Sequence, residues 1–251
     1  CEFKHGIYGL LGPNGSGKTT MMRCICGLLS PEKGSIECDC ENIGYLPQQF
    51  GAMKSLTVYE TMRYFATLKK IPKSNQDNEI RYCIDLVNLS DKIKNKVGSL
   101  SGGMVRRLGI AQAIMGNPEI VLFDEPTAGL DPEERVRFKS LLRKIKNDKT
   151  IIISTHIVSD VKSICDEIVI INEGRNVVQG TCSDITSIGN EKVFLLDEEY
   201  ENNLEGNYYV KDRISKDNKN YIIVLSSNFI EQGVSINADI EDGYLCALKD
   251  I

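Results

Sequence analysis

A complete phosphate-binding pattern lies near the start of the chain, in the run Gly12-Pro13-Asn14-Gly15-Ser16-Gly17-Lys18-Thr19. Its glycines let backbone N–H groups turn inward without a Cβ clash, which forms an anion nest at a helix N-terminus. Lys18 would bridge the β- and γ-phosphates of a nucleoside triphosphate, and the Thr19 hydroxyl would bind Mg²⁺. A glycine-rich turn with an accidental Lys-Thr is the alternative. We favour triphosphate binding by the loop residues Asn14, Gly15, Ser16, Gly17, Lys18, Thr19 and Thr20.

Two adjacent carboxylates follow an apolar run from Ile120 to Phe123 that is typical of a buried strand. Asp124 and Glu125 would therefore lie at the carboxyl edge of the sheet, beside the phosphate-binding loop. Asp124 suits the Mg²⁺ shell, whereas Glu125 points differently and can address an attacking water. A solvated strand end is the alternative, which the phosphate-binding pattern disfavours.

A second anion site is indicated where Ser101, Gly102 and Gly103 open a helix, with Ser101 as its N-cap. Taken alone, Ser-Gly-Gly is more often a loop. Its position ahead of the two carboxylates makes the signal stronger. From Leu100 to Met104 the chain resembles the nucleotide-binding domain of ABC transporters, whose signature is Leu-Ser-Gly-Gly-Gln.

The resemblance extends over most of the chain and implies roles for three more residues. Gln48 is similar to the glutamine of the family's Q-loop, which contacts Mg²⁺ or the lytic water. Asp131 ends a segment similar to the D-loop, which crosses the dimer interface. His156 is similar to the histidine that contacts the γ-phosphate. A lone histidine after a strand is more often structural, but here it stands in the family's motif order.

The resemblance also implies an activity, a set of ligands and a set of partners. Two chains would hold ATP between them and hydrolyse it with Mg²⁺, and Ser101 and Gly103 would act on the nucleotide of the opposite subunit. The partners would be ATP, a second nucleotide-binding domain (a second copy or a paralogue) and a separate transmembrane permease docked on residues 50–95. The implied residues are catalytic Lys18, Gln48, Glu125 and His156, nucleotide-binding Ser101, Gly102, Gly103 and Asp131, and the metal ligands Thr19, Gln48 and Asp124.

The elements that must position these residues alternate between short apolar strands and amphipathic helices, which predicts an α/β fold with a parallel sheet. With the resemblance, this becomes a P-loop NTPase (RecA-like) core with a helical signature subdomain and a small C-terminal α/β appendage. We expect an ATPase domain over 1–180, its helical subdomain over about 50–115, and the accessory region over 181–251. The strands are predicted over 7–11, 119–123, 149–154, 192–196, 208–210 and 221–225, and the first helix over 18–28.

Composition narrows the functional classes. The net charge of −5 gives no electrostatic reason to expect nucleic acid. No apolar run approaches the ~20 residues that span a bilayer, and no secretion signal opens the chain. We expect a cytoplasmic protein, peripheral on the inner face of the membrane through its permease. The nine cysteines are expected to be reduced, mostly buried thiols, with a zinc site at Cys24/Cys26 or Cys38/Cys40 as the alternative.

Three features of the chain depart from the family pattern. Met104 replaces the signature glutamine, the adenine-stacking aromatic residue is missing, and the stretch 34–44 is short. Because the chain begins at Cys1, we expect native segments beyond those given. Two alternatives stay open: an ABC-type ATPase without a membrane partner, and a regulatory module that binds ATP without turnover. The segment 240–245 is similar to the end of ABC exporters and favours export.

Overall fold

A six-stranded sheet forms the centre of the computed structural model, which describes residues 1–38, 40, 42–217 and 219–251. Five strands run parallel, and only the last edge strand pairs antiparallel. The predicted parallel α/β core is confirmed. In spatial order the strands are β2 (Ile43–Leu46), β3 (Ile120–Asp124), β4 (Thr150–Thr155), β1 (Gly6–Leu11), β5 (Glu167–Asn172) and β6 (Arg175–Gly180).

Helices cover both faces of this sheet, and alternation along each strand decides which side chains meet which helices. Val121 and Phe123 pack with α4 (Gly102–Ile114) and α5 (Pro132–Ile145), whereas Leu122 packs with α1 (Lys18–Ile25) on the other face. Because these buried strands carry apolar residues on both sides, they read as continuous apolar runs. The polar residues at their carboxyl ends are therefore exceptional and mark one edge of the sheet.

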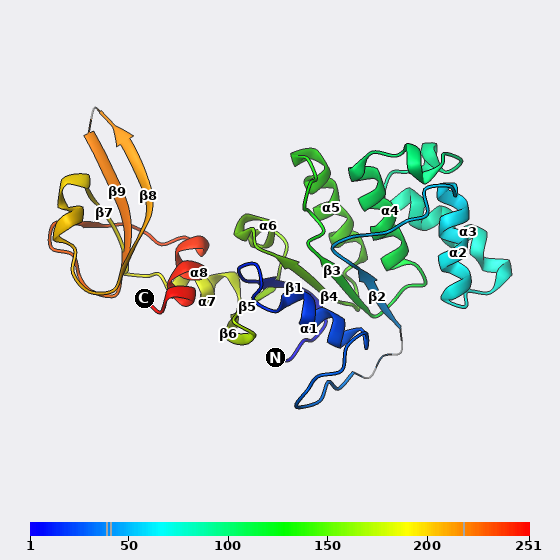
Figure 1. The fold of residues 1–251 in the computed structure, drawn as a ribbon, viewed down its shortest axis with the longest axis horizontal. Coiled ribbons are helices and arrows are strands. Elements are labelled where there is room, and N and C mark those ends of the chain that lie inside the picture. Colours follow the sequence, from blue (N-terminus) through cyan, green and yellow to red (C-terminus); the bar gives the residue numbers. More distant parts are fainter. Residues whose placement is uncertain (39, 41, 218) are drawn as a thin grey trace.

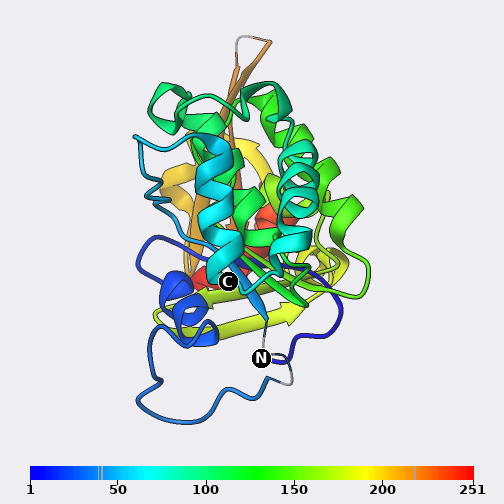
Figure 2. The same ribbon diagram turned by 90° about the vertical axis from the view of Figure 1, so that its right-hand side faces the viewer.

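A helical subdomain projects from the core, formed by α2 (Val58–Leu68), α3 (Lys73–Leu86) and α4 (Figure 2). Two short 3₁₀ turns, η1 (Ser90–Lys92) and η2 (Val97–Ser99), lead into α4. Thr57 and Glu60 form a capping box at the start of α2. Its apolar stripe, including Val58, Met62 and Ala66, joins the same core cluster as α3 and α4. The subdomain and the sheet therefore share one continuous core.

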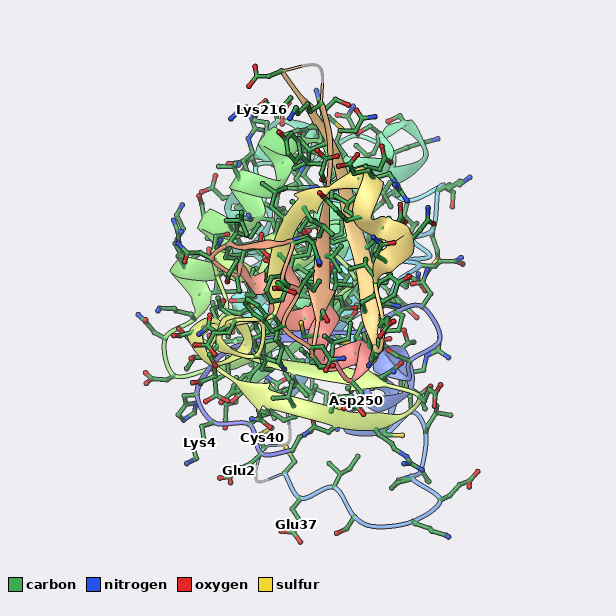
Figure 3. The ribbon with its side chains drawn as sticks, turned by 90° about the vertical axis from the view of Figure 1, so that its left-hand side faces the viewer. Glu2, Lys4, Glu37, Cys40, Lys216 and Asp250 are labelled. Carbon is green, nitrogen blue, oxygen red and sulfur yellow. The ribbon has the colours of Figure 1, made fainter. Side chains whose placement is uncertain are left out.

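The C-terminal region forms a second sheet, at the end of the molecule opposite α2 and α3 (Figure 1). Lys216 lies at the tip of its long hairpin, far from Glu2, Lys4 and Cys40 (Figure 3). The elements are α7 (Cys182–Ser187), β7 (Val193–Asp197), the 3₁₀ helix η3 (Glu198–Asn203), β8 (Tyr208–Lys216), β9 (Lys219–Ser226), β10 (Val234–Ser235) and α8 (Ile240–Lys249), and the sheet order is β10-β7-β9-β8.

The helices of this region pack on the six-stranded sheet and its helices as well as on the second sheet. Ile185 of α7 and Tyr244 of α8 join a buried cluster with Leu11 of β1 and with α6 (Val158–Lys162). Lys211 Nζ on β8 contacts Asp242 Oδ1 on α8 at 2.5 Å, which ties the second sheet to these helices. The domain boundary after Gly180 stays a prediction.

Several local predictions were wrong. The first helix ends at Ile25 and not at Leu28, because Gly27 takes a φ of 70° and closes a Schellman turn. β8 continues to Lys216, well past the predicted end at Val210. The nine cysteines are free thiols, but only Cys83 and Cys246 are fully buried.

None of the helices in the described part of the chain has both the length and the apolar character that a membrane span requires.

Candidate functional site

The glycine-rich loop connects β1 to α1 and leaves no room for side chains at its start. A Cβ on Gly12 would collide with the carbonyl oxygen of Ile171 and lie 2.6 Å from Ser16 Oγ. Gly17, at the N-cap of α1, has a φ of 105°, which strains any residue with a Cβ. The loop thus presents the N-terminus of α1 as a ready anion site. Asn14, Gly15 and Thr20 are exposed around it.

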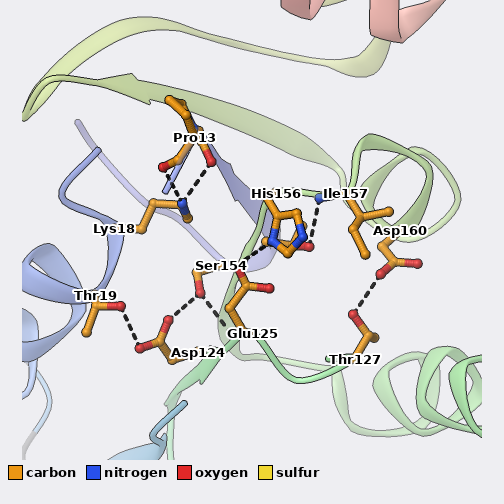
Figure 4. Close-up of polar contacts among 12 residues, drawn as sticks. Pro13, Lys18, Thr19, Asp124, Glu125, Thr127, Ser154, His156, Ile157 and Asp160 are labelled. Carbon is orange, nitrogen blue, oxygen red and sulfur yellow. Dashed lines mark hydrogen bonds and ion pairs between the residues drawn. The ribbon is translucent and has the colours of Figure 1, made fainter. Parts of the chain in front are cut away.

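Lys18 lies in this loop with its ammonium group turned back onto the backbone. Its Nζ donates to Gly12 O at 2.8 Å and to Pro13 O at 3.0 Å (Figure 4). Burial lowers the pKa of Lys18, while the nearby carboxylates of Glu125 and Asp124 oppose that shift. Ser16 Oγ is buried without a hydrogen-bond partner among the described residues. The loop therefore provides two groups that can bind an anion, the ammonium group of Lys18 and the free hydroxyl group of Ser16.

Asp124, the last residue of β3, lies next to the loop. Thr19 Oγ1 donates to Asp124 Oδ2 at 2.9 Å, and Ser154 Oγ of β4 donates to Asp124 Oδ1 (Figure 4). The structure thus brings together two of the three predicted metal ligands. A hydroxyl and a carboxylate are the oxygen donors that Mg²⁺ prefers.

Glu125 leaves the strand with a φ of 50°, a left-handed conformation that is strained for a residue with a side chain. Its N–H donates to Ser154 Oγ at 2.9 Å and to Ser154 O at 3.2 Å, which supports the turn. Its Oε1 lies 3.0 Å from Nδ1 of His156, at the end of β4. Its Oε2 is buried without a partner in the described part of the chain. One carboxylate oxygen is thus held and the other is free to accept a proton.

The signature residues lie apart from the phosphate-binding loop. Ser101 caps α4 by accepting from Met104 N at 3.2 Å. Gly102 and Gly103 line a cavity of about 250 Å³ together with Gln48 and the segment 128–130. No residue of the phosphate-binding loop lines this cavity. The structure therefore does not bring Gln48 and the signature to the ammonium group of Lys18 within one chain.

Two further details surround this cavity. A Cβ on Gly103 would collide with the carboxylate of Glu134, so a larger residue there would require that side chain to move. Asp131 caps α5, and its Oδ1 accepts from Glu134 N at 2.8 Å. Asp131 is thus the N-cap of α5.

Sequence reasoning did not identify two buried polar residues at the site. Ser154, fully buried, connects both carboxylate residues. Arg106, on α4, donates to backbone carbonyl groups of Asp124 and Glu125. The only sequence signal for Ser154 was its position directly after the apolar run Ile151–Ile153. Arg106 gave no separate signal, since arginine is ordinary on an exposed helix.

Known proteins share this architecture. The sequence profile of the family described as ABC transporter matches residues 3–128. An uncharacterized ABC transporter ATP-binding protein, YxlF of Bacillus subtilis, is 32% identical over 92% of this chain and 80% of its own length. The Nod factor export ATP-binding protein I of Burkholderia lata is 36% identical over 69% of this chain and 61% of its own length.

Solved structures agree with these relatives. The dimeric structure of an ABC transporter cassette superimposes with a TM-score of 0.67 at 25% identity, over 72% of this chain and 88% of that one. A post-hydrolysis state of that cassette, bound to ADP and Pi, gives a TM-score of 0.66 with the same identity and coverage.

Proposed function

The chain belongs to the ABC transporter family, and from this premise we propose that it binds and hydrolyses ATP to drive transport across a membrane. The observation that carries this proposal is the group formed by Thr19, Asp124, Glu125 and His156 beside the phosphate-binding loop. Each is a residue type that phosphoryl transfer requires, and together they come from the start of α1 and the carboxyl ends of β3 and β4 at one edge of the sheet. Phosphoryl transfer needs positioning and charge stabilisation more than covalent chemistry.

ATP binding would use loop groups that have no hydrogen-bond partner, or whose partners are carbonyl groups of the loop itself. Lys18 leaves its own carbonyl partners and contacts the β- and γ-phosphates, and the backbone N–H groups at the start of α1 hold the β-phosphate. The unpartnered hydroxyl of Ser16 supplies one further donor. Thr19 and Asp124, with Gln48, would hold Mg²⁺. When bound, Mg²⁺ neutralises charge on the phosphate oxygens.

Hydrolysis would use the two ends of the Glu125 carboxylate differently. The free Oε2 accepts a proton from water as that water attacks the γ-phosphate. Contact between Oε1 and His156 fixes the carboxylate, and the exposed part of the imidazole ring remains available to the γ-phosphate. Glu125 therefore acts as the general base and His156 as the group that orients it.

A second chain would complete the site. Gly102 and Gly103 line a separate cavity with Gln48 and the D-loop residues 128–130, Ser101 next to them is exposed, and no residue of the phosphate-binding loop lines that cavity. The helix N-terminus at Gly102 can act on a phosphate held by another subunit. Dimeric cassettes among the similar solved structures support this arrangement. ATP then forms part of the dimer interface, and hydrolysis loosens it.

A separate permease would dock on residues 50–95 and place the protein on the cytoplasmic face of the membrane. Met53, Tyr64 and Tyr82 are large apolar side chains exposed on this segment, which suits contact with another protein. Export is the favoured direction, supported by similarity to a protein named for Nod factor export.

Two measurements test the proposal. Purified protein should release phosphate from ATP in the presence of Mg²⁺, and we expect no release when Mg²⁺ is replaced by a chelator. Binding of ATP without turnover would indicate a regulatory module instead. Co-purification from detergent-solubilised membranes should recover a polytopic membrane protein, and its absence would favour an ABC-type ATPase that acts elsewhere.

A further inference from the structure

Arg106 makes an unusual set of contacts between two functional segments. Its guanidinium group is buried, with 8% of the residue exposed, and donates to five backbone carbonyl groups. Nη1 contacts Pro47 O at 2.8 Å and Gln48 O at 3.0 Å. On the other side, Nη2 contacts Glu125 O at 2.7 Å and Asp124 O, and Nε contacts Pro126 O at 3.3 Å.

The fixed shape of the guanidinium group explains why these contacts need arginine. Arginine presents five N–H donors in a rigid planar fork, whereas lysine concentrates its donors at one point on a flexible stem. No carboxylate in the described part of the chain forms an ion pair with Arg106 within 4.0 Å. A buried cation held only by neutral carbonyl groups costs desolvation energy, so its presence calls for a function beyond simple packing.

The two segments that Arg106 joins carry Gln48 and Glu125, two of the residues expected near the γ-phosphate. Glu125 has a strained backbone, and Arg106 binds the carbonyl groups on both sides of its Cα through Asp124 O and Glu125 O. Gln48 is exposed, and its backbone carbonyl is fixed by the same guanidinium group. Movement of the loop at Gln48 would therefore pull directly on the backbone of Glu125.

Arg107, the next residue, makes no such connection. Its Nη1 donates to Val87 O and Asn88 O, and its Nε lies 3.4 Å from the carboxylate of Glu134. These contacts hold α4 to the end of α3 and to α5. Arg107 is therefore a matched control, since it is another partly buried arginine on the same helix without contact to either functional segment.

We propose that Arg106 is a positioning residue for hydrolysis, which couples the loop that carries Gln48 to the general base Glu125. This inference rests on the proposed ATPase function. It assigns Arg106 no contact with ATP. Its loss should therefore affect turnover much more than nucleotide affinity.

Steady-state ATPase kinetics test the proposal with Arg106→Lys, Arg106→Gln and Arg107→Lys. We expect kcat to fall roughly 10- to 100-fold for both Arg106 variants, because small misplacements of catalytic groups cost about that much. The Kd for a fluorescent ATP analogue should stay within about 3-fold of the original protein. Arg107→Lys should retain kcat within about 2- to 3-fold, as expected for residues remote from the reacting groups.

A second arm separates positioning from a merely structural role. In single-turnover phosphate release with a Glu125→Gln background, adding Arg106→Lys should lower the rate less than 3-fold, because residues that act as a unit are not additive. The proposal would be overturned if Arg106→Lys lowered the rate of phosphate release by the same factor in the original protein and in the Glu125→Gln background. An unchanged kcat in Arg106→Lys would also overturn it, as would failure of both Arg106 variants to fold, which would make the role structural. Absence of turnover in the unmodified protein would instead reject the proposed ATPase function.

Discussion

Glu125 and His156 face each other at the ends of two neighbouring parallel strands, with Oε1 of Glu125 3.0 Å from Nδ1 of His156. The second oxygen of the same carboxylate is buried without a partner among the described residues. A buried, unpaired carboxylate oxygen costs free energy in the absence of substrate. The site is therefore arranged for a proton or a water that arrives with the nucleotide, and the predictions below test the groups around it.

Lys18→Ala should remove ATP binding or turnover and leave the fold intact. Among the described residues, the ammonium group donates hydrogen bonds only to the loop carbonyl groups of Gly12 and Pro13, and burial disfavours its charged form and lowers its pKa, so its removal should cost little folding free energy. Thermal unfolding should stay within about 3 °C of the original protein, because the change in stability is below about 1 kcal/mol. The exposed Lys33 provides a control as Lys33→Ala. Unaltered ATPase activity in folded Lys18→Ala would reject the assignment of the phosphate-binding loop.

Ser154→Ala should reduce both stability and turnover. The hydroxyl group connects Asp124 Oδ1 to the N–H of Glu125, and it is fully buried. Its loss leaves a buried carboxylate with one donor fewer, which costs about 1–3 kcal/mol of unfolding free energy. We also expect a loss of about 10-fold in kcat, since Glu125 loses part of its support.

Ser226→Ala is the control that separates the effect of Ser154→Ala on stability from its effect on turnover. Ser226 is a buried serine at the end of β9 whose hydroxyl accepts from Asn228 N, far from the site. Urea unfolding should show a cost of about 1 kcal/mol for its lost hydrogen bond, with kcat unchanged. Equal kcat values for the two variants would show that Ser154 does not support the carboxylate pair.

Much of the fold could be predicted from the sequence because its signals are local. The strand at 120–124, the N-caps Ser101 and Asp131, and the capping box at Thr57 each depend on residues a few positions apart. The three strands of the central sheet that were predicted, 7–11, 119–123 and 149–154, lie within one residue of β1, β3 and β4, whereas β2, β5 and β6 were not predicted. These signals need no knowledge of distant contacts.

The parts that could not be predicted depend on contacts between distant segments. Arg106 lies 58 positions from Gln48 and 19 from Glu125, so nothing local shows that one side chain joins them. The longer β8 forms because β9 pairs with it, although its outer residues are exposed and polar. The packing of α7 and α8 on α6 likewise has no local signal.

Met104→Gln should change the ATPase rate by less than about 3-fold, whereas Ser101→Arg should abolish it. Met104 contributes its N–H to the cap and packs its side chain at the edge of the core, so its replacement leaves the helix N-terminus available. Arginine at the exposed Ser101 would block the space that the second nucleotide needs. Ser101→Ala is the control, since it loses the cap, at about 1 kcal/mol, without adding bulk. A larger effect for Met104→Gln than for Ser101→Arg would contradict the assigned signature.

The contribution of Lys69 to protein stability should rise between pH 8 and 10.5. Its Nζ donates to Met115 O at 2.7 Å and to Ala113 O at 3.3 Å, at the end of α4. Burial lowers the pKa of Lys69 from its ordinary 10.5 to about 8, against weaker opposing effects of Cys83 and Glu79. In that window the unfolded chain binds more protons than the folded chain, so the free energy of unfolding increases with pH.

Lys69→Met removes this titration. We measure the free energy of unfolding with urea at pH 7.5 and at pH 9.5. The change between the two pH values should be about 1–2 kcal/mol less positive in Lys69→Met than in the original protein. The exposed neighbour Lys70 serves as a control in Lys70→Met. Identical pH slopes for the original protein and Lys69→Met would show that Lys69 is not desolvated in solution.

Glu125→Gln should nearly stop turnover while ATP still binds. Glutamine keeps the shape of the side chain and a hydrogen bond to His156, but it cannot accept the proton of water at Oε2. Removal of a general base typically costs about 10²- to 10⁴-fold in rate. Phosphate release measures the loss, and the Kd for ATP should change little. Hydrolysis at the original rate would show that Glu125 is not the base.

The same variant should also trap a dimer, because unhydrolysed ATP would remain between Lys18 of one chain and Ser101 of the other. Size-exclusion chromatography with light scattering should show dimers of Glu125→Gln with ATP and Mg²⁺, and monomers with ADP. Adding Ser101→Arg should prevent the dimer without affecting ATP binding, since Ser101 is exposed beside Gly102 and Gly103, which line a cavity that no residue of the phosphate-binding loop lines. A dimer that persists in this double variant would place the interface elsewhere, because the signature is then not needed to hold the nucleotide of the second chain.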